Sequence, residues 1–177
     1  MTIAIVVIVV LIVSIIIAKS SRQSIKDDAQ KQVENYQKEL LSRNIISEHQ
    51  LIHLGGHPYL QVNDKVTLQI KTNNTIHFQK ENTNTGEEIP ISNLTRYDVK
   101  TESQIQSDVT LTRLLALGIF AFGAKKKTKI EDQYLILSYV QNDIDIDCIF
   151  KRRFDYQQLG DIASTLNRVK VEINASK

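Results

Sequence analysis

The sequence predicts a mainly β domain, with α+β content, that is capped by one C-terminal helix and tethered to a membrane by an N-terminal helix. Three observations predict this fold class. The chain opens with an uncharged apolar run, its middle alternates apolar and polar residues with a period of two, and its end repeats apolar residues at helical spacing. The 177 residues suit one domain plus a connecting segment, and a net charge of +2 does not indicate a nucleic-acid-binding protein.

Residues 1–18 are the predicted transmembrane anchor. Residues 2–18 read TIAIVVIVVLIVSIIIA and carry no charge. At about 1.5 Å per helical residue they span about 25 Å, against a hydrocarbon core of about 30 Å. A cleaved signal peptide has a basic region before its apolar stretch and small residues at a cleavage site after it, and this run has neither. We therefore expect the segment to be retained as a single-pass anchor.

The orientation of the anchor follows from the cations beside it. Lys19 and Arg22 flank the run on its C-terminal side. Because lysine and arginine near a span are held on the cytoplasmic side, we expect the N-terminus outside the cell membrane and residues 19–177 in the cytoplasm. The lone Cys148 agrees with this, since one cysteine cannot form an internal disulfide.

Residues 19–54 are expected to form a juxtamembrane amphipathic helix and linker. Apolar side chains recur there at spacings of 4, 4, 3 and 4, at Ile25, Ala29, Val33, Tyr36 and Leu40. One interpretation is a parallel coiled coil that forms a homodimer; the other is a single helix that continues the anchor or packs on its own domain. About two heptads fit before Arg43 lands on the stripe, which is short for a coiled coil and favours the single helix.

Residues 55–177 are the predicted folded domain. Gly55, Gly56 and Pro58 stop a helix, and the period then changes to two. Alternation and turn residues indicate at least six strands, with a hairpin first and an edge strand containing Pro90 after it. The strands are expected near residues 66–70, 76–78, 89–91, 96–102, 134–140 and 144–150.

A C-terminal helix is predicted over residues 155–174. Its apolar side chains recur at spacings of 3, 4, 3 and 4, at Leu159, Ile162, Leu166, Val169 and Ile173. Antiparallel strands followed by one amphipathic helix suit a curled sheet whose open end the helix covers. This order of elements resembles the pleckstrin-homology-like (PH-like) superfold.

Residues 109–129 read VTLTRLLALGIFAFGAKKKTK, an apolar stretch that runs into lysines. Together with the following strand, this segment resembles a group of small bacterial single-pass membrane proteins with PH-like domains, in which a TxxRLLALG…KKK segment precedes a buried strand. The resemblance covers about residues 55–174 and implies a PH-like antiparallel barrel capped by the C-terminal helix. Fold membership alone does not imply a function.

The same segment supplies the candidate binding residues. In one interpretation its aromatic side chains dip into the bilayer interface while its lysines meet anionic lipid or a protein partner, each lysine contributing about 1 kcal/mol at an anionic surface. In the other its apolar residues belong to the core and the lysines to a solvated turn, which is the commoner fate of leucine and phenylalanine. The candidate residues are Arg113, Phe120, Phe122, Lys125, Lys126, Lys127 and Lys129.

Two short patterns resemble ligand-binding motifs but lack required residues. Gly118 and Gly123 have the spacing of a P-loop, yet Ala124 stands where the lysine must be. Asp143, Asp145 and Asp147 occupy the first, third and fifth positions of an EF-hand loop, but the following glycine and the final glutamate are missing. On a strand these carboxylates would share one exposed face, where they pair with lysines or receive a basic partner.

The remaining candidates are equally incomplete. His49, His53 and His57 are spaced by four, but glycines interrupt the helix that would stack them, so we expect exposed or hydrogen-bonded imidazoles rather than a zinc site. Cys148 occupies an apolar alternating position and is expected to be buried and inert. The sequence therefore assigns no catalytic, cofactor or metal site.

The function that these observations favour is a non-enzymatic, membrane-anchored interaction module. Its cytoplasmic domain is expected to bind a protein partner, through a sheet edge or the groove beside the C-terminal helix, or the anionic inner-leaflet surface. The first alternative is a structural component that dimerises within a membrane assembly. The second is an enzyme or small-molecule receptor with a pocket between sheet and helix.

Overall fold

The computed structural model describes residues 23, 25–83, 86–107, 132–155 and 158–176. These residues belong to two compact units, 1–43 and 44–177. The predicted anchor at residues 1–18 and its flanking Lys19 and Arg22 lie outside the described residues. Within the described part of the chain, no helix combines the length and the apolar character needed to cross a membrane.

The first unit contains the predicted amphipathic helix, described over residues 25–42. Most side chains of its predicted apolar stripe are exposed, with Ile25 at 68% and Val33 at 61%, whereas Leu40 at its C-terminal end is buried. The helical conformation stops before Asn44, whose φ of 59° is left-handed. Asparagine tolerates this conformation better than most residues and commonly follows the last turn of a helix.

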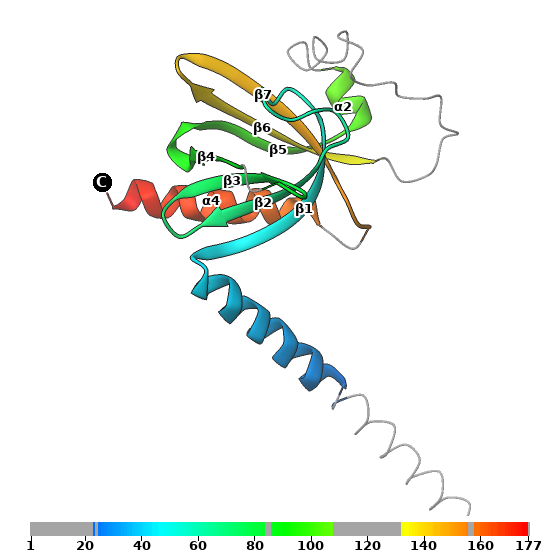
Figure 1. Ribbon diagram of the computed structural model, residues 1–177, viewed down its shortest axis with the longest axis vertical. Coiled ribbons are helices and arrows are strands. Elements are labelled where there is room, and N and C mark those ends of the chain that lie inside the picture. Colours follow the sequence, from blue (N-terminus) through cyan, green and yellow to red (C-terminus); the bar gives the residue numbers. More distant parts are fainter. Residues whose placement is uncertain (1–22, 24, 84–85, 108–131, 156–157, 177) are drawn as a thin grey trace, which may run out of the picture. The chain divides into compact units, whose positions relative to one another are not determined.

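The second unit is a seven-stranded antiparallel sheet with a C-terminal helix (Figure 1). The strand order is β4-β3-β2-β1-β7-β6-β5, so β4 and β5 form the two edges and the described sheet is open. The predicted hairpin, the edge strand with Pro90, the later strands and the C-terminal helix are all present. The strands are β1 (Ile45–Gly55), β2 (Lys65–Lys71), β3 (Thr75–Lys80), β4 (Gly86–Pro90), β5 (Leu94–Thr101), β6 (Gln133–Gln141) and β7 (Ile144–Arg152).

The central strand β1 corrects the sequence prediction, which placed its residues in a helix and linker ending at residue 54. β1 pairs with both β2 and β7 and carries polar residues through its middle. Two of these polar side chains form cross-strand hydrogen bonds: Gln50 donates to Thr67 over 3.0 Å, and Glu48 accepts from Gln69 over 2.7 Å. The strand therefore lacks the clean alternation on which the prediction relied.

Tight turns join the hairpins. Asn142 and Asp143 alone separate Gln141 from Ile144, which pair with each other in the ladder between β6 and β7. Both turn residues have positive φ, 52° and 62°, as a type I′ turn requires. The hairpin therefore brings Gln141 and the following acidic residues to one end of the sheet.

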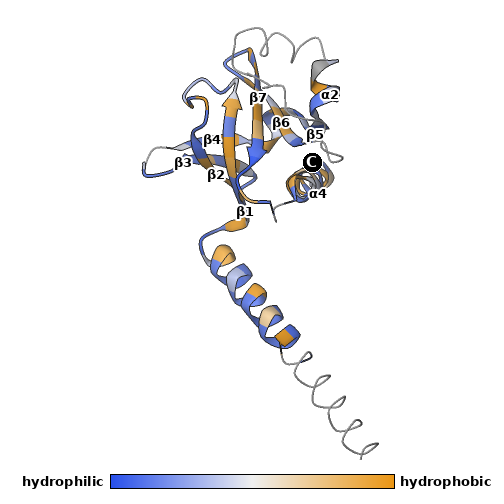
Figure 2. Ribbon diagram, turned by 90° about the vertical axis from the view of Figure 1, so that its right-hand side faces the viewer, coloured by the Kyte–Doolittle hydropathy of each residue, from blue (hydrophilic) through white to orange (hydrophobic). Residues whose placement is uncertain are grey.

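The main core lies between the inner face of the curled sheet and α4 (Leu159–Ala175). α4 packs against β5, the short 3₁₀ helix η1 (Ile91–Asn93) and β6. Its predicted apolar stripe is confirmed, since Leu159, Ile162, Leu166 and Val169 are buried. Figure 2 shows the underlying pattern, with hydrophobic and hydrophilic residues alternating along the strands.

A smaller apolar cluster covers part of the other face of the sheet. It contains residues of β1, β6 and β7 together with Ile105 of the short helix α2 (Glu102–Gln106). Strand β6 is consequently buried on both faces from Tyr134 to Tyr139. This confirms the prediction that its continuous apolar run forms a buried strand.

Candidate functional site

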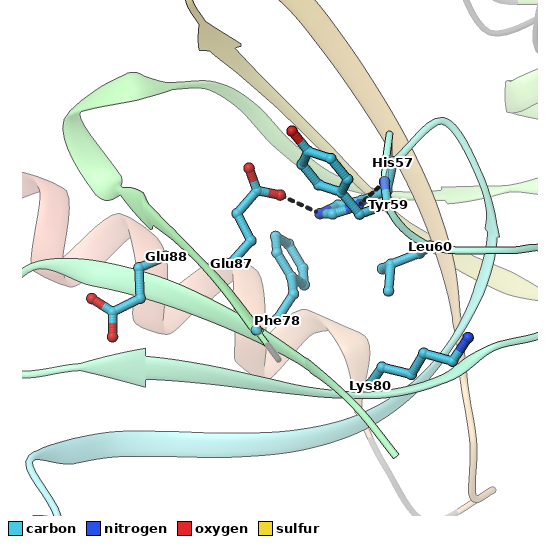
Figure 3. Close-up of a pocket in the computed structure, with 8 residues that line it drawn as sticks. His57, Tyr59, Leu60, Phe78, Lys80, Glu87 and Glu88 are labelled. Carbon is cyan, nitrogen blue, oxygen red and sulfur yellow. Dashed lines mark hydrogen bonds and ion pairs between the residues drawn. The ribbon is translucent and has the colours of Figure 1, made fainter. Parts of the chain in front are cut away.

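The binding residues predicted from the sequence lie outside the described part of the chain. This applies to Arg113, Phe120, Phe122, Lys125, Lys126, Lys127 and Lys129, all within residues 108–131. The described residues instead form a different candidate site, a cavity at one end of the sheet. It has a volume of about 560 Å³ and is lined by the connection between β1 and β2 and by strands β3 and β4 (Figure 3). None of its lining residues comes from α4, so it is not the predicted pocket between sheet and helix.

Gly56 turns the chain into this cavity. It follows β1 directly and has a φ of 96°, which other residues rarely adopt. A Cβ atom on Gly56 would stand 1.7 Å from the backbone oxygen of Asp147 in β7. The two backbones therefore lie so close together that this position has no room for a side chain. The close approach places His57, the next residue, in the wall of the cavity.

His53 and His57 form a hydrogen-bonded pair whose partners fix both tautomers. The backbone N–H of His57 donates to Nε2 of His53 over 3.2 Å, so the proton of the His53 ring is on Nδ1, 2.9 Å from the carbonyl oxygen of Gln61. The backbone N–H of Tyr59 donates to Nδ1 of His57 over 3.2 Å. The proton of the neutral His57 ring is therefore on Nε2, which faces Glu87.

Glu87 projects from β4 toward the same wall of the cavity. Its Oε1 accepts a hydrogen bond of 2.6 Å from the side-chain amide of Gln141 at the end of β6. Its Oε2 lies 3.0 Å from Nε2 of His57. A dashed line joins the two side chains in Figure 3. Neither Oε2 of Glu87 nor Nε2 of His57, both buried, makes a hydrogen bond of good geometry with a described residue. The carboxylate thus keeps acceptor capacity that the described residues do not use.

Burial keeps the histidines of the site neutral. Burial, and secondarily the neighbouring His53 ring, lower the pKa of His57 to about 4. Burial also lowers the pKa of His53, against opposing contributions that include its hydrogen bond to Gln61. At neutral pH the pair of His57 and Glu87 therefore carries one uncompensated negative charge.

Aromatic and aliphatic side chains form the rest of the wall. The Phe78 ring stacks on Phe150 with a centroid distance of 5.3 Å and meets His57 edge-on at 5.2 Å. Leu60 lies beside Phe78 in the cavity (Figure 3). Tyr59 is 74% exposed and stands at the opening. The cavity therefore combines an apolar floor with a charged wall.

The lysines around this end of the sheet are already paired with carboxylates. Lys80, which also lines the cavity, lies 2.9 Å from Asp64, and Lys65 lies 3.5 Å from Glu81. Lys71 pairs with Glu88, which also lines the cavity. The hairpin of β2 and β3 therefore offers no cluster of unpaired cations.

The structure separates the residues of the two metal-like patterns. Asp143 lies in the tight turn, while Asp145 and Asp147 follow on β7, where the Asp147 carboxylate accepts a hydrogen bond from Ser138. His49 and His53 belong to β1, and His57 lies beyond it. In the described ranges, no three histidine, cysteine, aspartate or glutamate side chains gather as they would around a metal ion.

Cys148 is buried as predicted. It is fully inaccessible within β7, and burial raises the pKa of its thiol. A neutral, inaccessible thiol behaves as a small apolar side chain rather than as a nucleophile.

Sequence reasoning missed the cavity because its two key residues are far apart in the chain. His57 belongs to a loop and Glu87 to an edge strand, and neither follows a periodic pattern. The signal that was available is Gly55-Gly56 before His57, since adjacent glycines mark a close backbone approach.

In comparisons with known proteins, no family model and no curated protein matches this chain.

Proposed function

We propose that the chain is a membrane-anchored, non-enzymatic interaction module of PH-like fold, whose folded unit binds a protein partner on the cytoplasmic side of the cell membrane. The apolar run at residues 2–18 and the cations after it support the anchor and its orientation. The strand order and the C-terminal helix support the PH-like fold.

The observation that carries the proposal is the open cavity together with the apolar side chains exposed around it. Tyr59 and Val62, in the connection between β1 and β2, are 74% and 42% exposed. Ile144, at the start of β7 on the same end of the sheet, is 62% exposed. Exposed apolar groups around a concave site are typical of protein-binding surfaces, and aromatic residues are enriched there.

The charges at this end favour a protein partner over a phosphate headgroup. A phosphate needs unpaired cations or backbone N–H groups, whereas Lys65, Lys71 and Lys80 are each held by a carboxylate. Asp143 and Asp145 add exposed negative charge on the neighbouring hairpin. An anionic membrane surface would be repelled by this end of the domain.

Site-specific photocrosslinking of the full chain in its native membrane tests this proposal. Tyr59 is replaced by benzoylphenylalanine, and the control carries the same group at Val171, which is 60% exposed on α4. We expect position 59 to give one discrete adduct with a protein and position 171 to give none. Adducts with lipid alone, or equal adducts from both positions, would contradict the proposal.

The lipid-surface version of the module rests on residues 114–129. Vesicles of zwitterionic lipid with and without anionic lipid, mixed with the full chain in detergent at several salt concentrations, test this version. Binding to anionic vesicles that weakens with salt and disappears on changing Lys125, Lys126 and Lys127 to glutamate would support it. If the three changes leave vesicle binding untouched, the lipid version fails.

The exposed helix of the first unit favours the dimer as a second candidate function. Ile25 and Val33, on its apolar stripe, are both exposed in the single chain, as is Tyr36 at 46%. A second copy of the helix would cover them in a coiled coil. Light scattering distinguishes a monomer from a dimer of the detergent-solubilised chain once the detergent mass is subtracted. A strict monomer would remove this candidate.

A further inference from the structure

The geometry points to a basic side chain, lysine or arginine, on an apolar segment of the protein partner as the group that enters the cavity. This inference rests on the proposed protein-binding function and names the chemistry of the partner. It is carried by the unused acceptor capacity of Glu87, by the neutral state of its neighbour His57, and by the apolar floor beneath them.

Glu87 is an anion with too few donors. An ionised carboxylate accepts about four hydrogen bonds, and here the described protein supplies one, from the amide of Gln141. The other oxygen is buried beside Nε2 of His57, and the two atoms make no hydrogen bond of good geometry. A half-buried anion without a cation is costly, and an ammonium or guanidinium group is the partner that removes this cost.

His57 is the independent sign of an incomplete site. Only 1% of its side chain is exposed, it lines the cavity, and its Nε2 has no hydrogen bond with any described residue, although buried polar atoms nearly always have one. Its Nδ1 already accepts from the backbone of Tyr59, so the ring is fixed and cannot turn away from Glu87. Because the ring is neutral, it cannot itself neutralise the carboxylate.

The remaining charges around the cavity leave this negative charge in place. Lys80 is the cation among the lining residues, and Asp64 holds it at 2.9 Å. Glu88, another lining residue, is paired with Lys71. The tight turn after Gln141 adds Asp143, and the start of β7 adds Asp145; both are exposed and form no ion pair with any described residue. An approaching segment therefore meets net negative charge at this end of the sheet.

The floor of the cavity fits the apolar part of such a segment. Phe78 and Leu60 form it, and the exposed ring of Tyr59 stands at the opening. The methylene stem of a lysine or arginine packs well on apolar and aromatic surface while its charged end reaches a carboxylate. A volume of about 560 Å³ accommodates one such side chain together with an apolar neighbour.

Panning of displayed random 12-residue peptides against the full chain in nanodiscs of zwitterionic lipid tests the inference, with empty nanodiscs for counter-selection. We expect the selected peptides to be enriched in lysine or arginine next to apolar residues. Their affinity for Glu87→Gln should fall about tenfold or more, because one charge-assisted hydrogen bond is lost. The control Glu172→Gln, on the exposed face of α4, should bind as the original chain does.

A second variant keeps the test decisive if Glu87→Gln disturbs the fold. Asp143→Asn with Asp145→Asn changes only exposed carboxylates, and it should weaken binding and reduce its salt dependence. Selected peptides that lack basic residues, or that bind all variants equally, would overturn the inference and leave the protein-binding proposal standing. If no peptide is selected, the inference is overturned, and the proposed function fails as well when crosslinking at Tyr59 gives no protein adduct.

Discussion

Neutral, buried His57 predicts a specific loss of stability in mild acid. Its pKa is lowered from 6.5 to about 4 in the folded chain. Between these values the unfolded state binds a proton that the folded state does not, so the free energy of unfolding falls as the pH falls from about 6.5 toward 4. Well above pH 6.5 the full contribution of the neutral His57 ring to the free energy of unfolding is present, because the ring is then neutral in both the folded and the unfolded state.

The expected magnitude follows from the two pKa values. At pH 5 about 97% of unfolded chains and about 9% of folded chains carry the proton on this ring, which corresponds to a loss of about 2 kcal/mol relative to pH 7.5. The Glu87 carboxylate at 3.0 Å stabilises the imidazolium and reduces this figure, so 2 kcal/mol is an upper value.

Urea unfolding of the full chain in mild detergent, followed by far-ultraviolet circular dichroism at pH 7.5 and pH 5.0, measures the effect. The comparison chain is His57→Gln, which keeps a polar side chain without a titrating ring. We expect the original chain to lose about 1 to 2 kcal/mol more than the variant over this interval. Equal losses in both chains would refute the assignment of a buried neutral imidazole.

Three further predictions address the fold around the site. Gly56→Ala should lower the free energy of unfolding by at least about 2 kcal/mol, because Gly56 has a positive φ and the added Cβ would meet the β7 backbone. Gly160→Ala in α4 places its Cβ in open space and should be neutral or stabilising. Thermal unfolding of the two variants compares these effects. Leu166→Ala should lower the free energy of unfolding by about 2 to 5 kcal/mol, because Leu166 is fully buried. Val171→Ala should lower it by under about 0.5 kcal/mol, because Val171 is exposed on the same helix. Equal losses in denaturant titrations would contradict the packing of α4. Cys148 should resist thiol reagents until urea unfolds the chain, and prompt labelling of the native protein would show that β7 is misplaced.

The periodic elements were the ones that could be predicted from the sequence. Strand β2 alternates strictly through Val66, Leu68 and Ile70, and α4 repeats its apolar residues at helical spacing, because each packs one face against the core. Strand β1 could not be recognised this way. Its residues Glu48 and Gln50 find hydrogen-bond partners on β2, and those partners are known only once the strands are paired.

The candidate site depends still more on the assembled fold. Glu87 looks like an ordinary exposed residue of an edge strand, yet its position opposite Phe78 in the ladder turns it toward the core face. Gln141 reaches it from β6, 54 residues away in the chain. No local pattern encodes such a meeting, whereas the glycine pair before His57 was a local signal of the close backbone approach.

Labelling of one engineered cysteine tests the central claim, which is a membrane-held module that presents the open end of its sheet to the cytoplasm. Because Cys148 is buried, Tyr59→Cys places a single reactive thiol at the cavity opening. A membrane-impermeant maleimide should leave this thiol unlabelled in intact cells and label it in inverted membrane vesicles, with the protein remaining in the membrane fraction. Labelling in intact cells, or recovery of the chain free of membrane, would contradict the account.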